Sequence, residues 1–169
     1  MCAERSSSSS GAGSKDSQFK KALNYSFLLL KYRARSKGEI ISRLKLRGVA
    51  GSLIDRVIDY LQEYNYINDG EFARGLAAAS LKKGWGPRKI ESALGKLKIS
   101  QDLREEVLKD KSIYNSKIRE LIEKRVARHK DKKNIFGKVL RYMVNRGFEY
   151  QDIIEQIQRI EIKERNKII

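Results

Sequence analysis

Apolar residues recur at helical spacing along most of the chain, and one stretch of this pattern occurs three times. The copies are residues 39–49, 89–99 and 138–148, whose starts lie 50 and then 49 residues apart. Their apolar positions align without a gap: Ile40, Leu44 and Val49 match Ile90, Leu94 and Ile99, and they also match Val139, Met143 and Phe148. The first and third copies share an Arg-Gly pair before the last apolar residue. Self-similarity at a period of this size is typical of repeat proteins.

The helical pattern groups into three units of three helices. We predict three-helix repeats at residues 18–67, 68–112 and 113–163. Residues 1–17 are rich in serine and glycine and have almost nothing to bury, so we expect a disordered tail there and a frayed tail at residues 164–169. Nowhere does an alternating strand pattern precede a hairpin turn. The predicted fold is all-α, with three tandem repeats in an elongated array. The sequence does not decide whether this array is straight or curved.

Local signals mark several helix ends. Ser36 and Glu39 have the spacing of a capping box that opens the second helix. Gly48 suits the left-handed conformation that closes this helix, and Ser52 is predicted to cap the third. Lys98 stands where the sibling repeats have glycine. Because a left-handed lysine costs roughly 1 kcal/mol, we expect the second turn to have another geometry.

The charge of the chain narrows the choice of partner. Lysine and arginine total 37 against 21 acidic residues, which gives a net charge of +16 and a pI near 10.0. A charge of this size favours a polyanionic partner: nucleic acid, an acidic protein face or an anionic membrane surface. The alternative is a very soluble protein whose basic side chains only face water.

The charges are also sorted by helix. Residues 31–48 carry seven basic side chains against one acidic, and residues 117–147 carry eleven against three. The third helices have the opposite balance, with five acids and one base in residues 52–71 and four acids and one base in residues 149–161. If the units stack, the first and second helices would present a basic strip and the third helices a neutral-to-acidic one. This pattern suits an extended charged partner better than a small molecule.

The sequence offers little for catalysis. His129 is the only histidine, and its basic neighbours favour a solvated surface residue over a catalytic base. Cys2 is the only cysteine, so an intramolecular disulfide is excluded. Cys2 and His129 together supply two side chains, which is fewer than the four ligands that structural zinc requires. Glycine-rich nucleotide motifs do not occur. Glu161-Ile-Lys163 resembles a nuclease acid-x-lysine pair, but such pairs more often stabilise a helix. We predict a non-enzymatic protein with no cofactor and no metal.

The cellular compartment that we expect is inferred from targeting features that do not occur in the sequence. No run approaches the roughly 20 apolar residues of a membrane span, and the N-terminus has no apolar stretch of secretory type. A single cysteine fits a reducing environment. We therefore predict a cytoplasmic protein without a membrane partner.

Two joined motifs resemble the RecX family of bacterial recombination regulators. They read Ala22-Leu…Arg35-Ser36…Glu39-Ile…Leu44…Gly48 and Val57-Ile-Asp-Tyr-Leu61…Tyr66-Ile-Asn-Asp69…Phe72-Ala73. The middle and last repeats add Gly84, Ile90 and Leu94, and then Arg146-Gly-Phe148 and Ile153. The likeness covers about residues 20–160. Lys98 departs from the glycine that the family tends to have, and Asn68 stands where a second acid is common.

The resemblance implies a three-repeat, non-enzymatic protein that acts as a monomer. Members bind the RecA recombinase along the groove of its filament on DNA. They modulate its ATPase and strand-exchange activities, usually as inhibitors, in recombination, DNA repair and the SOS response. The residues we expect to contact the recombinase or DNA are basic positions of first and second helices: Arg33, Arg35, Arg43, Arg47, Lys82, Arg88, Arg141 and Arg146. For each of them, a solvated side chain is the alternative.

Other interpretations stay open. A nonspecific nucleic-acid coat would need no recombinase, and its affinity would fall steeply with salt. A sequence-specific helix-turn-helix reader is disfavoured, because the helix that would enter the major groove carries Asp55, Asp59 and Glu63. Trp85, between two glycines, is either an exposed stacking platform or a plug between the first two units.

Overall fold

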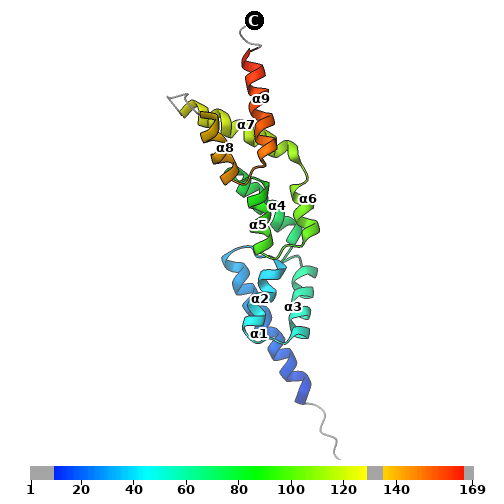
Figure 1. Ribbon diagram of the computed structural model, residues 1–169. Helices are drawn as coiled ribbons and strands as arrows, with labels where there is room; N and C mark the ends of the chain where they lie inside the picture. Colours follow the sequence, from blue (N-terminus) through cyan, green and yellow to red (C-terminus); the bar gives the residue numbers. More distant parts are fainter. Residues whose placement is uncertain (1–9, 129–134, 166–169) are drawn as a thin grey trace, which may run out of the picture. The chain divides into compact units, whose positions relative to one another are not determined.

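The computed structural model describes residues 10–128 and 135–165, with side chains described at 15–128 and 135–160. Nine α-helices and no strands occupy these ranges (Figure 1), so the all-α prediction is confirmed for the described part of the chain. Their bounds are α1 Ser10–Tyr32, α2 Lys37–Leu46, α3 Gly51–Glu63, α4 Asp69–Lys82, α5 Pro87–Lys96, α6 Gln101–Leu108, α7 Lys111–Arg128, α8 Ile135–Asn145 and α9 Tyr150–Arg165. The chain divides into a first unit, residues 1–72, and a second unit, residues 73–169, with the boundary inside α4.

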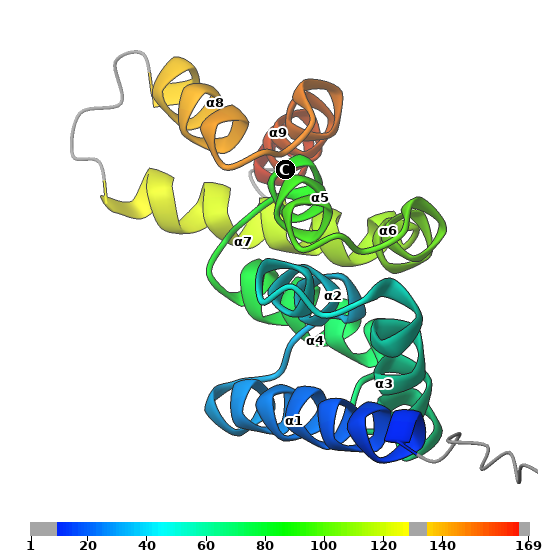
Figure 2. The ribbon, with the colours of Figure 1, turned by 90° about the horizontal axis from the view of Figure 1, so that it is seen from below.

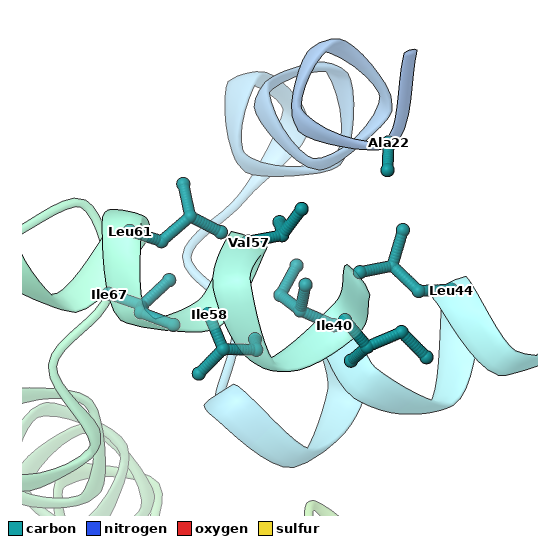
Figure 3. Close-up of a cluster of buried hydrophobic side chains, with 8 residues drawn as sticks. Ala22, Ile40, Leu44, Val57, Ile58, Leu61 and Ile67 are labelled. Carbon is teal, nitrogen blue, oxygen red and sulfur yellow. The ribbon is translucent and has the colours of Figure 1, made fainter. Parts of the chain in front are cut away.

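In the first unit α1, α2 and α3 pack around one apolar cluster (Figure 3). α3 contributes its stripe at helical spacing, α2 contributes two residues one turn apart, and α1 covers them with a small side chain. The buried members are Ala22, Ile40, Leu44, Ile54, Val57, Ile58, Leu61 and Ile67. Full burial of one large aliphatic side chain stabilises a fold by about 1.5–3 kcal/mol. The periodicity that predicted these helices therefore also supplies their core.

A second apolar cluster joins α7, α8 and α9, and α8 and α9 pack on the same side of α7 (Figure 2). It is built from Ile118, Ile122, Ile135, Val139, Met143, Phe148, Ile153 and Ile157. Val139 and Met143 are fully buried, as are Ile40 and Leu44 at the matching positions of the first copy. These parallels agree with a third repeat at residues 113–163, which stays a prediction.

The three turns that follow α2, α5 and α8 have one geometry. Each has a left-handed residue, Gly48 at φ +72°, Lys98 at φ +60° and Gly147 at φ +86°. The amide of this residue donates to the carbonyl three residues back, and the amide of the next residue donates to the carbonyl five back, at 2.9–3.2 Å. This is the Schellman motif. The expectation of a different turn at Lys98 is wrong: the same two hydrogen bonds and the burial of Ile99 offset the strain of a left-handed lysine.

The capping box is confirmed, whereas two other predictions of helix ends are wrong. The Ser36 hydroxyl accepts from the Glu39 amide, and the Glu39 carboxylate accepts from the Ser36 amide. Ser52 does not cap α3, because the Schellman turn closes so tightly that the helix begins at Gly51, with Ala50 as an N-cap lacking a side-chain bond. α1 begins at Ser10, so residues 10–17 are helical rather than disordered. Extending an existing helix costs far less than nucleating one, which lets α1 continue without burial.

In the second unit, the turn between α4 and α5 lies directly against the turn between α8 and α9. The Gly86 amide donates to the Arg146 carbonyl at 2.7 Å, and the Arg88 amide donates to the Gly147 carbonyl at 3.1 Å. A Cβ atom added to Gly86 would lie 2.5 Å from the Gly147 carbonyl oxygen. Glycine is required here because two backbones approach too closely for any side chain.

Candidate functional site

The eight basic residues predicted to contact a partner are spread over both units, and the structure divides them into two groups. Five contact other groups of their own unit: Arg33, Arg35, Arg47, Arg88 and Arg146. For the other three, Arg43, Lys82 and Arg141, the described residues supply no ion pair, hydrogen bond or aromatic ring, and all three are exposed. The second group is therefore the better set of contact candidates.

Arg33 and Arg35 both pair with the carboxylate of Glu39. The Arg33 Nη2 atom lies 2.5 Å from Glu39 Oε1, and the Arg35 Nη1 atom lies 3.3 Å from the same oxygen. Arg35 Nε also donates to the Leu29 carbonyl at 3.3 Å. Because Glu39 is also the partner of the Ser36 amide in the capping box, these contacts fix the junction of α1 and α2. The sequence could not show this, since the pairs depend on how the chain turns at residues 33–36.

Arg47 has no acidic partner among the described residues and lies on an aromatic ring instead. Its guanidinium carbon is 3.7 Å from the centre of the Tyr25 ring. Such a cation–π contact contributes about 0.5–1 kcal/mol when exposed. It orders the side chain without neutralising it, so the charge stays available to an anion.

Arg88 and Arg146 hold the paired turns of the second unit. The Arg88 side chain donates to Glu149, and Arg146 Nη1 donates to the Lys83 carbonyl at 2.8 Å. The Arg146 guanidinium carbon lies 5.1 Å from the Tyr142 ring centre, and that of Arg125 lies 4.6 Å from it. Both predicted contact residues thus stabilise the unit in which they lie.

The structure also brings together residues that we did not predict. On α1, Gln18, Lys21 and Tyr25 lie along one face and line a groove with Arg47 and Leu53. The available signal was their spacing of three and four residues, which places them on one face of a helix. It was missed because this stretch adjoins the serine- and glycine-rich tail.

The remaining candidates for chemistry stay unsupported. Among the residues that the structure describes, no group of three or more His, Cys, Asp or Glu side chains is placed to hold a metal ion. Cys2, His129 and the side chains of Glu161 and Lys163 lie outside the described residues. Trp85 is half-buried, with Lys89 Nζ 4.7 Å from its ring centre. Within the described ranges no helix combines the length and apolar content needed to cross a membrane.

Comparison with known proteins gives the family. Two family models match the chain. The family model for the first three-helix domain of RecX matches residues 22–61, and the family model for the second three-helix domain of RecX matches residues 68–108. The chain belongs to the RecX family. The first matched range lies within α1–α3 and begins inside α1, and the second coincides closely with α4–α6.

Individual RecX relatives agree along most of the chain. The regulatory protein RecX of Caldanaerobacter subterraneus subsp. tengcongensis is 27% identical over 139 residues, covering 79% of this chain and 68% of that protein. The regulatory protein RecX of Acinetobacter baylyi is 27% identical over 141 residues, with coverage of 83% and 89%. A crystal structure of RecX from Lactobacillus salivarius superposes with a TM-score of 0.73 at 25% identity, covering 89% of this chain and 99% of that one.

Proposed function

We propose that this chain is a non-enzymatic regulator that binds the RecA recombinase and its DNA filament and inhibits ATPase and strand-exchange activity. The observation that carries the proposal is its membership of the RecX family, whose curated relatives bear the name regulatory protein. Such a regulator works as a cytoplasmic monomer in recombination, DNA repair and the SOS response, and it needs no cofactor.

The charge distribution supports this function. Arg43, Lys82 and Arg141 are exposed without an acidic partner in the described part of the chain, on a protein of net charge +16. Basic side chains of this kind contact phosphates or acidic protein faces, and phosphate contacts position a protein along nucleic acid without reading its sequence. The filament offers both kinds of partner along one extended path.

A nonspecific nucleic-acid coat is the second candidate, and the net charge of +16 favours it. A coat acts only when it is abundant enough to cover the DNA, whereas a filament regulator acts at low occupancy. The two functions therefore differ in stoichiometry and in salt dependence.

The deciding experiment measures ATP hydrolysis by a RecA recombinase on single-stranded DNA at near-physiological salt, while this protein is added in substoichiometric steps. We expect activity to fall well below one copy per recombinase subunit. If ATPase activity falls only when the protein is abundant enough to coat all the DNA, the proposed regulatory function is wrong and the nonspecific coat is the better account.

A further inference from the structure

A groove of about 510 Å³ runs in the first unit between α1 and the turn that joins α2 to α3. A recess of about 240 Å³ adjoins it and shares three lining residues, Gln18, Ala50 and Leu53. Together they form a channel along α1 that reaches the first turn of α3. We call this channel the α1 groove.

The α1 groove is positively charged. Lys21 and Arg47 line its larger part, and Lys15 and Arg56 line the smaller one. No aspartate or glutamate is among the described residues that line either part. Four cations form a field that attracts a polyanion and that no carboxylate of the lining neutralises.

The α1 groove also holds an aromatic ring paired with a planar cation. The Arg47 guanidinium covers the Tyr25 ring at 3.7 Å. Tyr25 is half-buried and packs against the apolar cluster of the first unit, so the ring is held in place. A ring and a guanidinium fixed in this way provide flat faces on which a base stacks, and the polar Gln18 beside them adds an amide group.

We propose that the α1 groove binds a single strand of DNA. One base stacks against the Tyr25–Arg47 pair, while Lys21, Lys15 and Arg56 contact the phosphates on either side. A duplex would not satisfy the aromatic part of the site, because its bases are already stacked on each other. The choice of DNA as the nucleic acid rests on the proposed function, whereas the charge and the stacking surface are properties of the groove itself.

The test measures binding of the full chain to a fluorescein-labelled thymidine oligonucleotide by fluorescence polarisation at several salt concentrations. Lys21→Gln should weaken binding about tenfold at low salt and reduce the slope of log affinity against log salt by about 0.7, the value for one phosphate contact on a single strand. Lys96→Gln is the matched control: it removes the same charge from an exposed lysine of the second unit, and it should leave both quantities nearly unchanged.

Stacking is tested at Tyr25. Tyr25→Phe keeps the ring and should retain binding, whereas Tyr25→Leu should weaken it about tenfold with an unchanged salt slope. Circular dichroism of Tyr25→Leu shows whether α1 still folds. Independently, an oligonucleotide containing 5-iododeoxyuridine should photo-crosslink to Tyr25 in the unaltered protein, as read by mass spectrometry. Crosslinks confined to the second unit, or an equal loss for Lys21→Gln and Lys96→Gln, would overturn the proposal.

Two further measurements distinguish a DNA site from a general anion site and from a surface that acts only on the recombinase. If polyglutamate of equal charge displaces the oligonucleotide as well as unlabelled oligonucleotide does, the groove takes acidic chains generally and the DNA site is wrong. The recombinase ATPase assay, run with Lys21→Gln, reports on regulation apart from DNA binding. Loss of oligonucleotide binding with regulation intact supports the groove as a DNA site that regulation does not need. Binding through the groove without any regulation by the unaltered protein supports the groove and refutes the proposed function.

Discussion

The amide of Gly86 donates a hydrogen bond of 2.7 Å to the carbonyl of Arg146, sixty residues further along the chain. This bond joins two turns of the second unit without using a side chain. The Cα atom of Gly86 also lies directly against the peptide bond between Gly147 and Phe148, since an added Cβ would lie 2.5 Å from the Gly147 carbonyl oxygen. The second glycine of the Gly84-Trp-Gly-Pro87 segment is thus explained by packing between turns.

Gly86→Ala should destabilise the second unit by about 2–3 kcal/mol, because one of the two turns must move to admit the methyl group. Urea unfolding followed by fluorescence of Trp85, the only tryptophan, reports on this unit. Gly75→Ala on α4 is the matched control: its Cβ would meet nothing within 4 Å, and alanine in a helix should stabilise by about 0.5–1 kcal/mol. A Gly86→Ala protein as stable as the unaltered one would contradict the packing argument.

A second pair of variants tests the helix caps. Ser36→Ala should lower the free energy of unfolding of the first unit by about 1 kcal/mol, because the Glu39 amide loses its side-chain acceptor. Ser52→Ala should change it by less than about 0.5 kcal/mol, since Ser52 is exposed and caps nothing. Both variants are measured by urea titration of helical circular dichroism. Equal losses would mean that Ser52 does cap α3.

The division of the basic residues predicts two kinds of loss of function. The triple variant Arg43→Gln, Lys82→Gln, Arg141→Gln should raise the concentration needed to inhibit the recombinase about tenfold while leaving the free energy of unfolding unchanged. Arg35→Gln should instead lower stability by about 1 kcal/mol, because its mostly buried side chain bonds Glu39 and the Leu29 carbonyl. Normal inhibition by the triple variant would remove these residues from the interface.

Acid pH should destabilise α7 in the folded protein by protonating the carboxylate of Glu120. The pKa of this carboxyl is lowered from 4.5 to about 2 because the side chains of Lys117 and Lys124 donate hydrogen bonds to it, at 2.8 and 2.5 Å. A lowered pKa means that the ionised form stabilises the folded state above pH 4.5 and that this contribution is lost as the pH falls toward 2. Carboxyl NMR titration should place the midpoint well below that of an ordinary glutamate. In Glu120→Gln this part of the pH dependence should vanish, and a midpoint near 4.5 in the unaltered protein would refute the pairing.

The sequence was sufficient for the helices and their buried faces, because these depend on spacing along the chain. Ile40, Leu44, Ile90, Leu94, Val139 and Met143 are all fully buried, as their shared frame predicts. Prediction from the sequence failed where a local conformational preference competes with tertiary contacts. Lys98 adopts a conformation that its side chain disfavours, because the turn and the buried residue after it offset the cost.

The candidate site was less predictable for a different reason. A basic residue looks the same in a sequence whether it pairs with Glu39, as Arg35 does, or faces water, as Arg43 does. The partner is decided by the turn between two helices, which spacing does not determine. The groove that Lys21 and Tyr25 line could not be predicted for the converse reason, since it is formed with the α2–α3 turn that faces them.

The three turns after α2, α5 and α8, which share one geometry, make the chain sensitive to changes in length. Lysine replaces glycine at the left-handed position of the second turn, and the hydrogen bonds are unchanged. One residue inserted between Leu44 and Val49, however, would break the register of the two turn hydrogen bonds, from the Gly48 amide to the Lys45 carbonyl and from the Val49 amide to the Leu44 carbonyl, and would displace the start of α3. The turns thus act as spacers of fixed length. Insertions or deletions within them should therefore unfold the unit in which they fall.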